Sequence, residues 1–264
     1  MITSLVNPDL KRAPELVAER GSTLGQPMHL LGMTTSTSDE AKRAAKDGAP
    51  HGSTWVAEQQ TAGRGRQGRA WVSPRGENLL FSVLVRVACP PSRLPPIALI
   101  VGLAVRDAVA RAAPDADVRI KWPNDVLVGK KKVAGILVEA ITMGTRVEAV
   151  VIGVGINVHT RAFPEELEDR ATSVSLLARD PPDRASILAD VLAGLDRDLH
   201  VVVSRGLGLV RQRLEATDAL RGQRVRSDTG DEGIAEGIDD EGRLAVRRGD
   251  GVLARWSAGE VHLG

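Results

Sequence analysis

A short run of glycines and arginines could bind an anion. The run reads Gly63-Arg64-Gly65-Arg66-Gln67-Gly68-Arg69 and lies between two expected strands. Its glycines let the backbone approach a ligand closely, and its arginines can surround an anion with charge-assisted hydrogen bonds. We therefore expect an anion-binding loop, and the plain alternative is a solvated basic turn.

The same loop matches the spacing of a dinucleotide-binding fingerprint. That fingerprint needs a helix that opens at the third glycine, whereas here Pro74 and Gly76 lead into a strand. An oxidoreductase is therefore disfavoured. Alternating arginine and glycine is also typical of nucleic-acid-binding tails, but those tails are longer, disordered and not flanked by strands.

Two further segments carry residues that could do chemistry. The turn Lys121-Trp122-Pro123-Asn124-Asp125 combines a cation, an amide and a carboxylate, and a hairpin turn ending at Lys132 precedes the apolar run 133–137. Ser36 and Thr37 stand in a hydroxyl-rich stretch at the start of an expected helix. Thr37 with Glu40 also fits a capping box, so plain helix capping is the alternative for these hydroxyls.

Taken together, these segments resemble the biotin protein ligases. The resemblance rests on Ser36-Thr37, on Gln60 before the glycine-arginine loop, on 121–125 and on 132–137, in that order. It extends over nearly the whole chain, because 153–157 and 257–261 also look like segments of that family. Such an enzyme joins biotin to ATP, giving biotinyl-5′-adenylate and pyrophosphate, and then passes the biotinyl group to one lysine of a carrier domain.

The resemblance implies a biotin pocket and a nucleotide site that share residues. A cyclic urea offers one carbonyl acceptor and two N–H donors, which hydroxyl and amide side chains can match. The residues implied for biotin are Ser36, Thr37, Gln60, Gly63, Arg64, Gly65, Arg66, Lys132 and Gly135. The residues implied for ATP or the adenylate are Arg64, Arg66, Arg69, Trp71, Asn124, Lys132 and Asn157.

The resemblance also implies three catalytic residues. Arg66 and Lys132 would hold the reacting carboxylate and phosphate together, which is mainly positioning and electrostatics. Asp125 would help remove a proton from the carrier lysine, since a free lysine with a pKa of about 10.4 is a poor nucleophile at neutral pH. ATP and biotin are the expected substrates, and Asn157 is expected to assist a magnesium ion. Ser38 stands where the family usually has asparagine.

The hydrophobic patterns supply the elements that must position these residues. They predict an α+β fold, with a mixed or antiparallel sheet, flanking helices and a small C-terminal β-barrel. The resemblance further implies a catalytic domain like that of class II aminoacyl-tRNA synthetases. The expected strands are 28–33, 54–58, 78–87, 118–122, 125–128, 133–141 and 147–158, and the expected helices are 37–48, 95–114, one from 183, and 207–215.

Three regions are expected along the chain. We expect residues 1–27 to form a flexible N-terminal arm, residues 28–218 to form the catalytic domain, and residues 219–264 to form the barrel. Short apolar runs separated by glycines indicate the barrel strands. These runs are 224–227, 233–238, 244–246 and 252–256.

The composition excludes several classes of protein. Hydrophobic residues make up 42%, charged residues 26%, and the net charge is only +1, which is typical of a folded protein rather than a disordered polyelectrolyte or a basic nucleic-acid coat. Cys89 is the single cysteine and the histidines lack ligand spacing, so neither a disulfide nor a transition-metal site is expected. No apolar run approaches the roughly 20 residues of a membrane span, and no signal peptide is evident, so we expect a cytoplasmic protein with no membrane partner.

Two other functions stay open at this point. A lipoate or octanoate ligase of the same fold would keep the chemistry but change the acid; the glycine-arginine loop favours biotin. A non-enzymatic nucleic-acid-binding protein is disfavoured by the low net charge and the absence of tyrosine. The expected partner is the biotin carboxyl carrier domain of a carboxylase, and a homodimer is left open. Too few residues precede Ser36 for a winged helix-turn-helix, so we expect no DNA binding.

Overall fold

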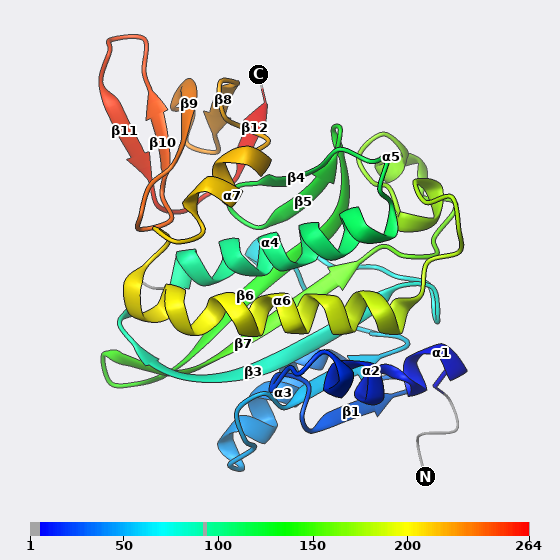
Figure 1. Cartoon of the computed structure of the whole chain (residues 1–264). Helices are drawn as coiled ribbons and strands as arrows, with labels where there is room; N and C mark the ends of the chain where they lie inside the picture. The colour runs from blue at the N-terminus through cyan, green and yellow to red at the C-terminus, as the bar shows by residue number, and fades with distance from the viewer. Residues whose placement is uncertain (1–5, 92–93, 264) are drawn as a thin grey trace.

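Two β-sheets organise the chain in the computed structural model, which describes residues 6–91 and 94–263 (Figure 1). The larger sheet has seven strands in the order β1-β2-β3-β7-β6-β5-β4. Only β1 and β2 pair in parallel, so the predicted mixed sheet is confirmed. Its strands are β1 (Met28–Leu31), β2 (Thr54–Ala57), β3 (Leu79–Cys89), β4 (Val118–Lys121), β5 (Asp125–Val128), β6 (Lys131–Met143) and β7 (Arg146–Ile156).

Helices cover the two faces of this sheet unequally. The long helices α4 (Leu94–Ala112) and α6 (Arg184–Arg205) run side by side over one face, as their apolar patterns predict (Figure 1). The shorter α3 (Thr37–Lys46) packs on β2, β3 and β7 from the other side. Of the remaining helices, α5 spans Glu165–Glu168, and α7 spans Arg211–Thr217, starting later than predicted.

The alternation of side chains along the central strands separates a packed face from an open one. On β3, Phe81 lies in the main core, whereas Leu84 lies in a smaller cluster with residues of α3. On β7, Val154 faces the main core, so Gly153 and Gly155 on either side of it face the α3 side. That side of the sheet therefore carries few side chains near its centre.

The N-terminal region is not a loosely held arm, and the prediction is wrong for residues 6–27. This segment forms α1 (Pro8–Lys11) and α2 (Ala13–Glu19), and both helices contact α6. Leu10, Val17 and Leu24 are fully buried, so the segment belongs to the main core. Residues 1–5 of the predicted arm lie outside the described residues.

A buried ion network fixes this segment to the sheet. Arg184, at the start of α6, is 1% exposed and donates hydrogen bonds of 2.8 Å to Asp9 Oδ1 and Oδ2 and to Glu58 Oε2. Glu58, at the end of β2, is equally buried. Burial alone would raise the pKa of Asp9, but the hydrogen bonds and the charge of Arg184 hold that pKa below its ordinary value. The network thus ties three distant segments together at one point.

The C-terminal residues form the second sheet. Its five antiparallel strands have the order β11-β10-β9-β8-β12, so backbone pairing leaves β11 and β12 as edges. The indole of Trp122 is buried and donates to the carbonyl oxygen of Gly242 at 2.9 Å, which joins this sheet to the larger one. The strands are β8 (Arg224–Ser227), β9 (Glu232–Ile238), β10 (Leu244–Arg247), β11 (Leu253–Trp256) and β12 (Val261–Leu263), the last of which no pattern predicted.

The buried network predicts a large effect on stability. Arg184→Met should lower the free energy of unfolding by about 3 kcal/mol or more, because it leaves the buried Glu58 carboxylate unpaired. Arg179→Met is the matched control, since the Arg179 side chain is 80% exposed and its ion pair with Asp115 contributes less than about 1 kcal/mol. Urea denaturation of both variants measures the difference, and equal losses would contradict the role given to the network.

Candidate functional site

A pocket opens on the sparsely covered face of the large sheet, between α3, the glycine-arginine loop and the central strands. Most of the residues singled out in the sequence converge there, although they come from distant segments. The lining residues are Ser36, Thr37, Ser38, Gln60, Arg64, Gly65, Arg66, Trp71, Phe81, Asn124, Lys132, Gly135, Ile136, Leu137, Gly153, Val154 and Gly155.

Two glycines form the floor of this pocket. Gly135 on β6 lies directly opposite Gly155 on β7, so both face the same side of the sheet. The indole of Trp71 lies over both positions: a Cβ on Gly155 would be 2.5 Å from Trp71 Cε2, and one on Gly135 would be 3.0 Å from Trp71 Cζ3. Any larger side chain at either position would meet this ring. The sequence alone does not identify Gly155 as a site residue, because only strand pairing reveals its neighbour.

The hydroxyl-rich end of the pocket is built around Thr37. The backbone N–H and the hydroxyl of Thr37 both donate to Gln60 Oε1, at 2.7 and 3.0 Å. Ser36 is the residue that precedes α3, but no side-chain hydrogen bond caps the helix. Glu40 instead accepts a hydrogen bond from the Thr34 hydroxyl at 2.8 Å. The capping-box interpretation is therefore wrong, and Gln60 satisfies the helix start.

Two buried serines extend this polar cluster. The Ser82 hydroxyl on β3 lies 2.8 Å from Thr37 Oγ1 and 3.0 Å from Ser38 Oγ. Ser38 thus has a defined partner despite its departure from the family pattern. Ser82 carries no motif in the sequence, and only its register opposite Gly153 brings it to this cluster.

Cationic side chains occupy the other end of the pocket. Arg66 Nη1 donates to Asn124 Oδ1 at 3.1 Å, and Asn124 Nδ2 donates to the carbonyl oxygen of Ile136 at 2.8 Å. Lys132 Nζ lies 2.6 Å from Asp125 Oδ1 and 5.5 Å from the centre of the Trp71 ring. The pocket-lining residues include three cations, Arg64, Arg66 and Lys132, and no carboxylate. Such a surface suits anionic ligands.

The glycine-arginine loop folds into a small hairpin over the pocket. The backbone N–H of Trp71 donates to the Gly63 carbonyl oxygen at 2.9 Å, and the backbone N–H of Gly65 donates to the Arg69 carbonyl oxygen at 2.7 Å. Only a single 3-10 turn, Arg66–Gly68, occurs within it, and Arg69 then continues in extended conformation. Since no long helix opens at Gly68, the loop is not a dinucleotide fingerprint.

Four of the implied site residues do not line the pocket: Gly63, Arg69, Asp125 and Asn157. Gly63 packs against the backbone carbonyl oxygen of Trp71, and Asp125 contacts the pocket-lining Lys132. Arg69 instead binds Glu260 of the C-terminal sheet, with Nη1 donating to Oε1 at 2.7 Å. The hydrogen bond from Arg69 lowers the pKa of Glu260.

Asn157 directly follows β7 and is held by hydrogen bonds to two other segments. Its Nδ2 donates to the carbonyl oxygen of Thr172 at 3.0 Å, and its backbone N–H bonds to Val133. Magnesium prefers carboxylate, phosphate and water oxygens in octahedral geometry. The residues lining the pocket, with no carboxylate among them, do not fit a magnesium ion held by the protein itself.

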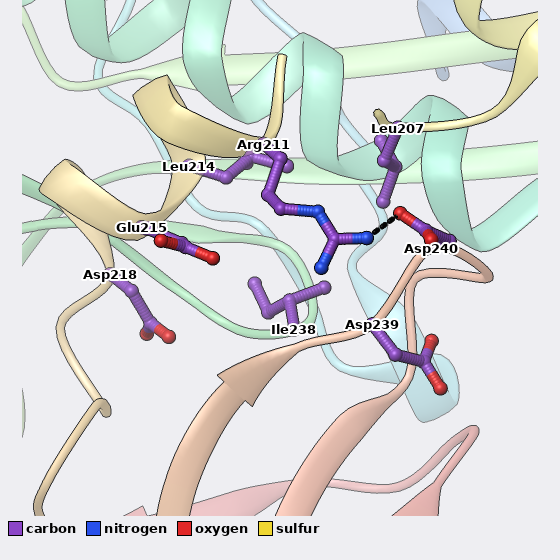
Figure 2. A pocket seen from close by; sticks show the side chains of 8 residues that line it. All are labelled: Leu207, Arg211, Leu214, Glu215, Asp218, Ile238, Asp239 and Asp240. Atoms are coloured by element: carbon purple, nitrogen blue, oxygen red, sulfur yellow. Dashed lines mark hydrogen bonds and ion pairs between the residues drawn. The ribbon is translucent and has the colours of Figure 1, made fainter. Parts of the chain in front are cut away.

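A second, smaller cavity lies between α7 and the C-terminal sheet (Figure 2). Leu207, Leu214 and Ile238 form its apolar walls, and Arg211 bridges it to reach Asp240 (Figure 2). Burial raises the pKa of Asp218 at its edge. None of the residues singled out in the sequence lines it, so it is separate from the pocket described above.

Comparison with known proteins decides the family. The model "Biotin/lipoate A/B protein ligase family" matches residues 31–157, and "Biotin protein ligase C terminal domain" matches residues 222–264. A biotin--[acetyl-CoA-carboxylase] ligase of Mycobacterium tuberculosis is 37% identical over 259 residues, covering 96% of this chain and 90% of the relative. The chain belongs to the biotin protein ligase family.

Other members of the biotin protein ligase family agree with this assignment. The bifunctional ligase/repressor BirA of Bacillus subtilis is 35% identical over 246 residues, 91% of this chain and 75% of the relative. The biotin protein ligase of Aquifex aeolicus, solved in complex with biotin and ATP, superposes with a TM-score of 0.77 at 28% identity, covering 90% of this chain and 98% of that one. The predicted α+β class is thereby confirmed. Among the described residues, no helix has the length and apolar character needed to cross a membrane.

The glycine floor predicts how Trp71 responds to one added methyl group. Gly155→Ala should displace the indole, because the new Cβ would lie 2.5 Å from Trp71 Cε2. The indole N–H of Trp71, which is buried without a partner in the described structure, should shift in the NMR spectrum and exchange faster with solvent. Gly249→Ala, where nothing lies within 4 Å of the new Cβ, is the control and should leave that signal in place.

Proposed function

We propose that this chain activates biotin with ATP and transfers the biotinyl group to one lysine of a biotin carboxyl carrier domain. The observation that carries the proposal is the pocket itself, which joins a hydroxyl and amide end to a cationic end without a carboxylate. The distribution of charge along biotin matches this pocket, because biotin has a neutral cyclic urea at one end and a carboxylate at the other. The biotin ligases among the relatives support this reading over lipoate ligation.

Ser36, Thr37 and Gln60 would hold the ureido group, because their hydroxyl and amide groups line one end of the pocket. The alkyl chain would then run past the Trp71 indole, which covers Gly135 and Gly155. The carboxylate would reach Arg66 and Lys132 at the cationic end. Gly65 would bring the loop backbone close to the ligand, and Arg64 would add positive charge there. Gly63 would contribute indirectly, by leaving room for the backbone of Trp71.

In the first step, a carboxylate oxygen of biotin attacks the α-phosphorus of ATP. An O–P bond forms to give biotinyl-5′-adenylate, and the bond to pyrophosphate breaks. Arg66 and Lys132 would stabilise the charge that builds on the phosphorus oxygens, because fixed cations attract an anion more strongly in a protein pocket than in water. Asn124 holds Arg66 in place at 3.1 Å.

The nucleotide would lie along the loop and the ends of β5 and β6. Trp71 offers an indole face for adenine, and Arg69 lies at the rim of the loop. Asn157 would act only indirectly, by holding the segment that follows Thr172. Because no carboxylate is among the pocket-lining residues and the nearby Asp125 is paired with Lys132, we propose that magnesium arrives bound to the phosphates of ATP.

In the second step, the ε-amine of the carrier lysine attacks the acyl carbon of the adenylate. A C–N bond forms, AMP leaves, and the amine must lose a proton. We assign that proton to Asp125, whose Oδ1 lies 2.6 Å from Lys132 Nζ. Lys121, opposite Asp125 across β4 and β5, has its pKa lowered by burial.

The C-terminal sheet would support the loop rather than the chemistry. Arg69 and Gln67 of the loop bond to Glu260 and Asp228 of that sheet. We propose residues 28–218, completed by the packed segment 6–27, as the catalytic domain and residues 219–264 as a C-terminal module. The reaction consumes ATP, so we place it in the cytoplasm, with a carboxylase carrier as the partner.

The test of the function is biotin-dependent adenylate formation. The purified chain, incubated with biotin, magnesium and α-labelled ATP, should give labelled biotinyl adenylate and pyrophosphate. Lipoate and octanoate are run in parallel and should give none. Adenylate from lipoate alone, or no product from folded protein, would contradict the proposal.

Loss of either cation should impair the first step. Arg66→Ala and Lys132→Ala should each slow adenylate formation at least about tenfold, because each removes a charge-assisted contact to the transition state. Single-turnover formation of labelled adenylate measures the effect. Lys130→Ala is the control, since Lys130 lies in the β5–β6 hairpin turn and does not line the pocket.

The two half-reactions should separate at Asp125. Asp125→Asn keeps the size of the side chain but cannot accept a proton, so transfer to the carrier should slow by about tenfold or more while adenylation changes less. Preformed biotinyl adenylate and carrier domain are mixed, and the transfer rate is measured against pH. Equal losses in both half-reactions would show that Asp125 acts only as the partner of Lys132.

A further inference from the structure

A chain of polar groups runs from the pocket wall into the sheet. It links Gln60, Thr37, Ser82 and Ser38 through separations of 3.0, 2.8 and 3.0 Å. Ser82 is fully buried and does not line the pocket, whereas the other three residues do. Ser82 is therefore the interior link between two side chains that can touch a ligand.

The orientation of the Gln60 amide is fixed at one end of this chain. The backbone N–H of Thr37 lies 2.7 Å from the terminal atom of Gln60, and a backbone N–H can only donate. That atom must therefore be the amide oxygen, and Gln60 Nε2 is the amide atom that takes no part in these two bonds. A side-chain amide nitrogen only donates hydrogen bonds, so Gln60 Nε2 offers the pocket a hydrogen-bond donor.

The direction of every hydroxyl proton then follows. A carbonyl oxygen cannot donate, so the Thr37 hydroxyl donates to Gln60 Oε1. Thr37 has no second proton, so the hydroxyl of Ser82 must donate to Thr37. Ser82 has then used its proton as well, so the hydroxyl of Ser38 must donate to Ser82. Ser38 is left with lone pairs and no free proton.

We propose that Ser82 is a positioning residue that makes Ser38 an obligate hydrogen-bond acceptor toward the ligand. The inference rests on the proposed function, because the ligand concerned is the cyclic urea of biotin. With Gln60 Nε2 as donor and Ser38 Oγ as acceptor, the pocket matches the carbonyl and an N–H of a urea. It rejects a ring that carries an oxygen acceptor where the urea has that N–H.

The strand register preserves the space that this arrangement needs. Gly153 pairs directly with Ser82, and a Cβ at Gly153 would lie 2.8 Å from Ser38 Oγ. A side chain there would push the Ser38 hydroxyl away from Ser82. Gly153 and Ser82 therefore act as a pair: Gly153 leaves room for the Ser38 hydroxyl, and Ser82 accepts the hydrogen bond from it.

The test compares biotin with its two cyclic carbamate analogues, in each of which a ring oxygen replaces one ureido N–H. Binding to the full chain is measured by calorimetry, so the readout does not depend on turnover. The wild-type chain should bind the analogue whose oxygen faces Ser38 at least about 100-fold more weakly than biotin, because two acceptors then meet.

Ser82→Ala should reduce that selectivity at least about tenfold. Without Ser82 to accept its hydrogen bond, the Ser38 hydroxyl can rotate and donate a hydrogen bond to the ring oxygen of the analogue. Biotin itself should lose about tenfold in affinity, the equivalent of one hydrogen bond. The affinity for ATP should stay unchanged.

Two further variants separate positioning from loss of structure. Ser53→Ala removes another fully buried serine hydroxyl, bonded to the Pro50 carbonyl at 2.8 Å away from the pocket, and should leave the selectivity intact. Ser82→Cys replaces the hydroxyl by a weak acceptor of similar shape, and serves if the alanine variant does not fold.

The outcomes distinguish the inference from the function on which it rests. A wild-type chain that binds no biotin overturns the proposed function and the inference together. Wild-type biotin binding, with the same selectivity in wild type, Ser82→Ala and Ser82→Cys, overturns the inference alone. Reduced selectivity in the Ser82 variants but not in Ser53→Ala supports it.

Discussion

The central constraint on this fold is that residues opposite each other on paired antiparallel strands must face the same side of the sheet. Gly155 on β7 pairs with Gly135 on β6, and Gly135 pairs in turn with Asp125 on β5. Two adjacent strands thus lack side chains at one level, and the next strand contributes a carboxylate. The other face of the same strands is fully apolar and packed under α4 and α6. One sheet therefore provides both the rigid core and the hollow above it.

The positions of the ligand-facing side chains depend on what holds the ends of the strands. Glu58 closes β2 just before Gln60, and it is locked by Arg184 from α6 and by the backbone N–H of Asn7. A buried arginine bridging two carboxylates tolerates little movement, because any shift leaves a charge without a partner. The N-terminal helices are thus part of the scaffold that places Gln60 against Thr37.

The sequence allowed the main sheet, the two long helices and most of the pocket to be predicted, because each depends on local periodicity or on a contiguous motif. The loop 63–69 and the turn 121–125 fall where expected, and Arg66 and Lys132 lie together. Ser82 and Gly155 could not be found this way, since their importance comes from strand register. The N-terminal helices were not predicted, because their apolar pattern is short and the α6 surface that buries it is distant in the sequence.

Trp122 and Arg69 connect the two sheets at separate points. The indole of Trp122 bonds to Gly242 from the turn that carries Asn124, and Arg69 bonds to Glu260 from the loop that carries Arg66. Both partners of the Arg66–Asn124 hydrogen bond are therefore mounted on segments fastened to the C-terminal sheet. Thermodynamic linkage is reciprocal, so any free energy by which the docked sheet favours ligand binding returns as an equal stabilisation of that docking once the ligand is bound.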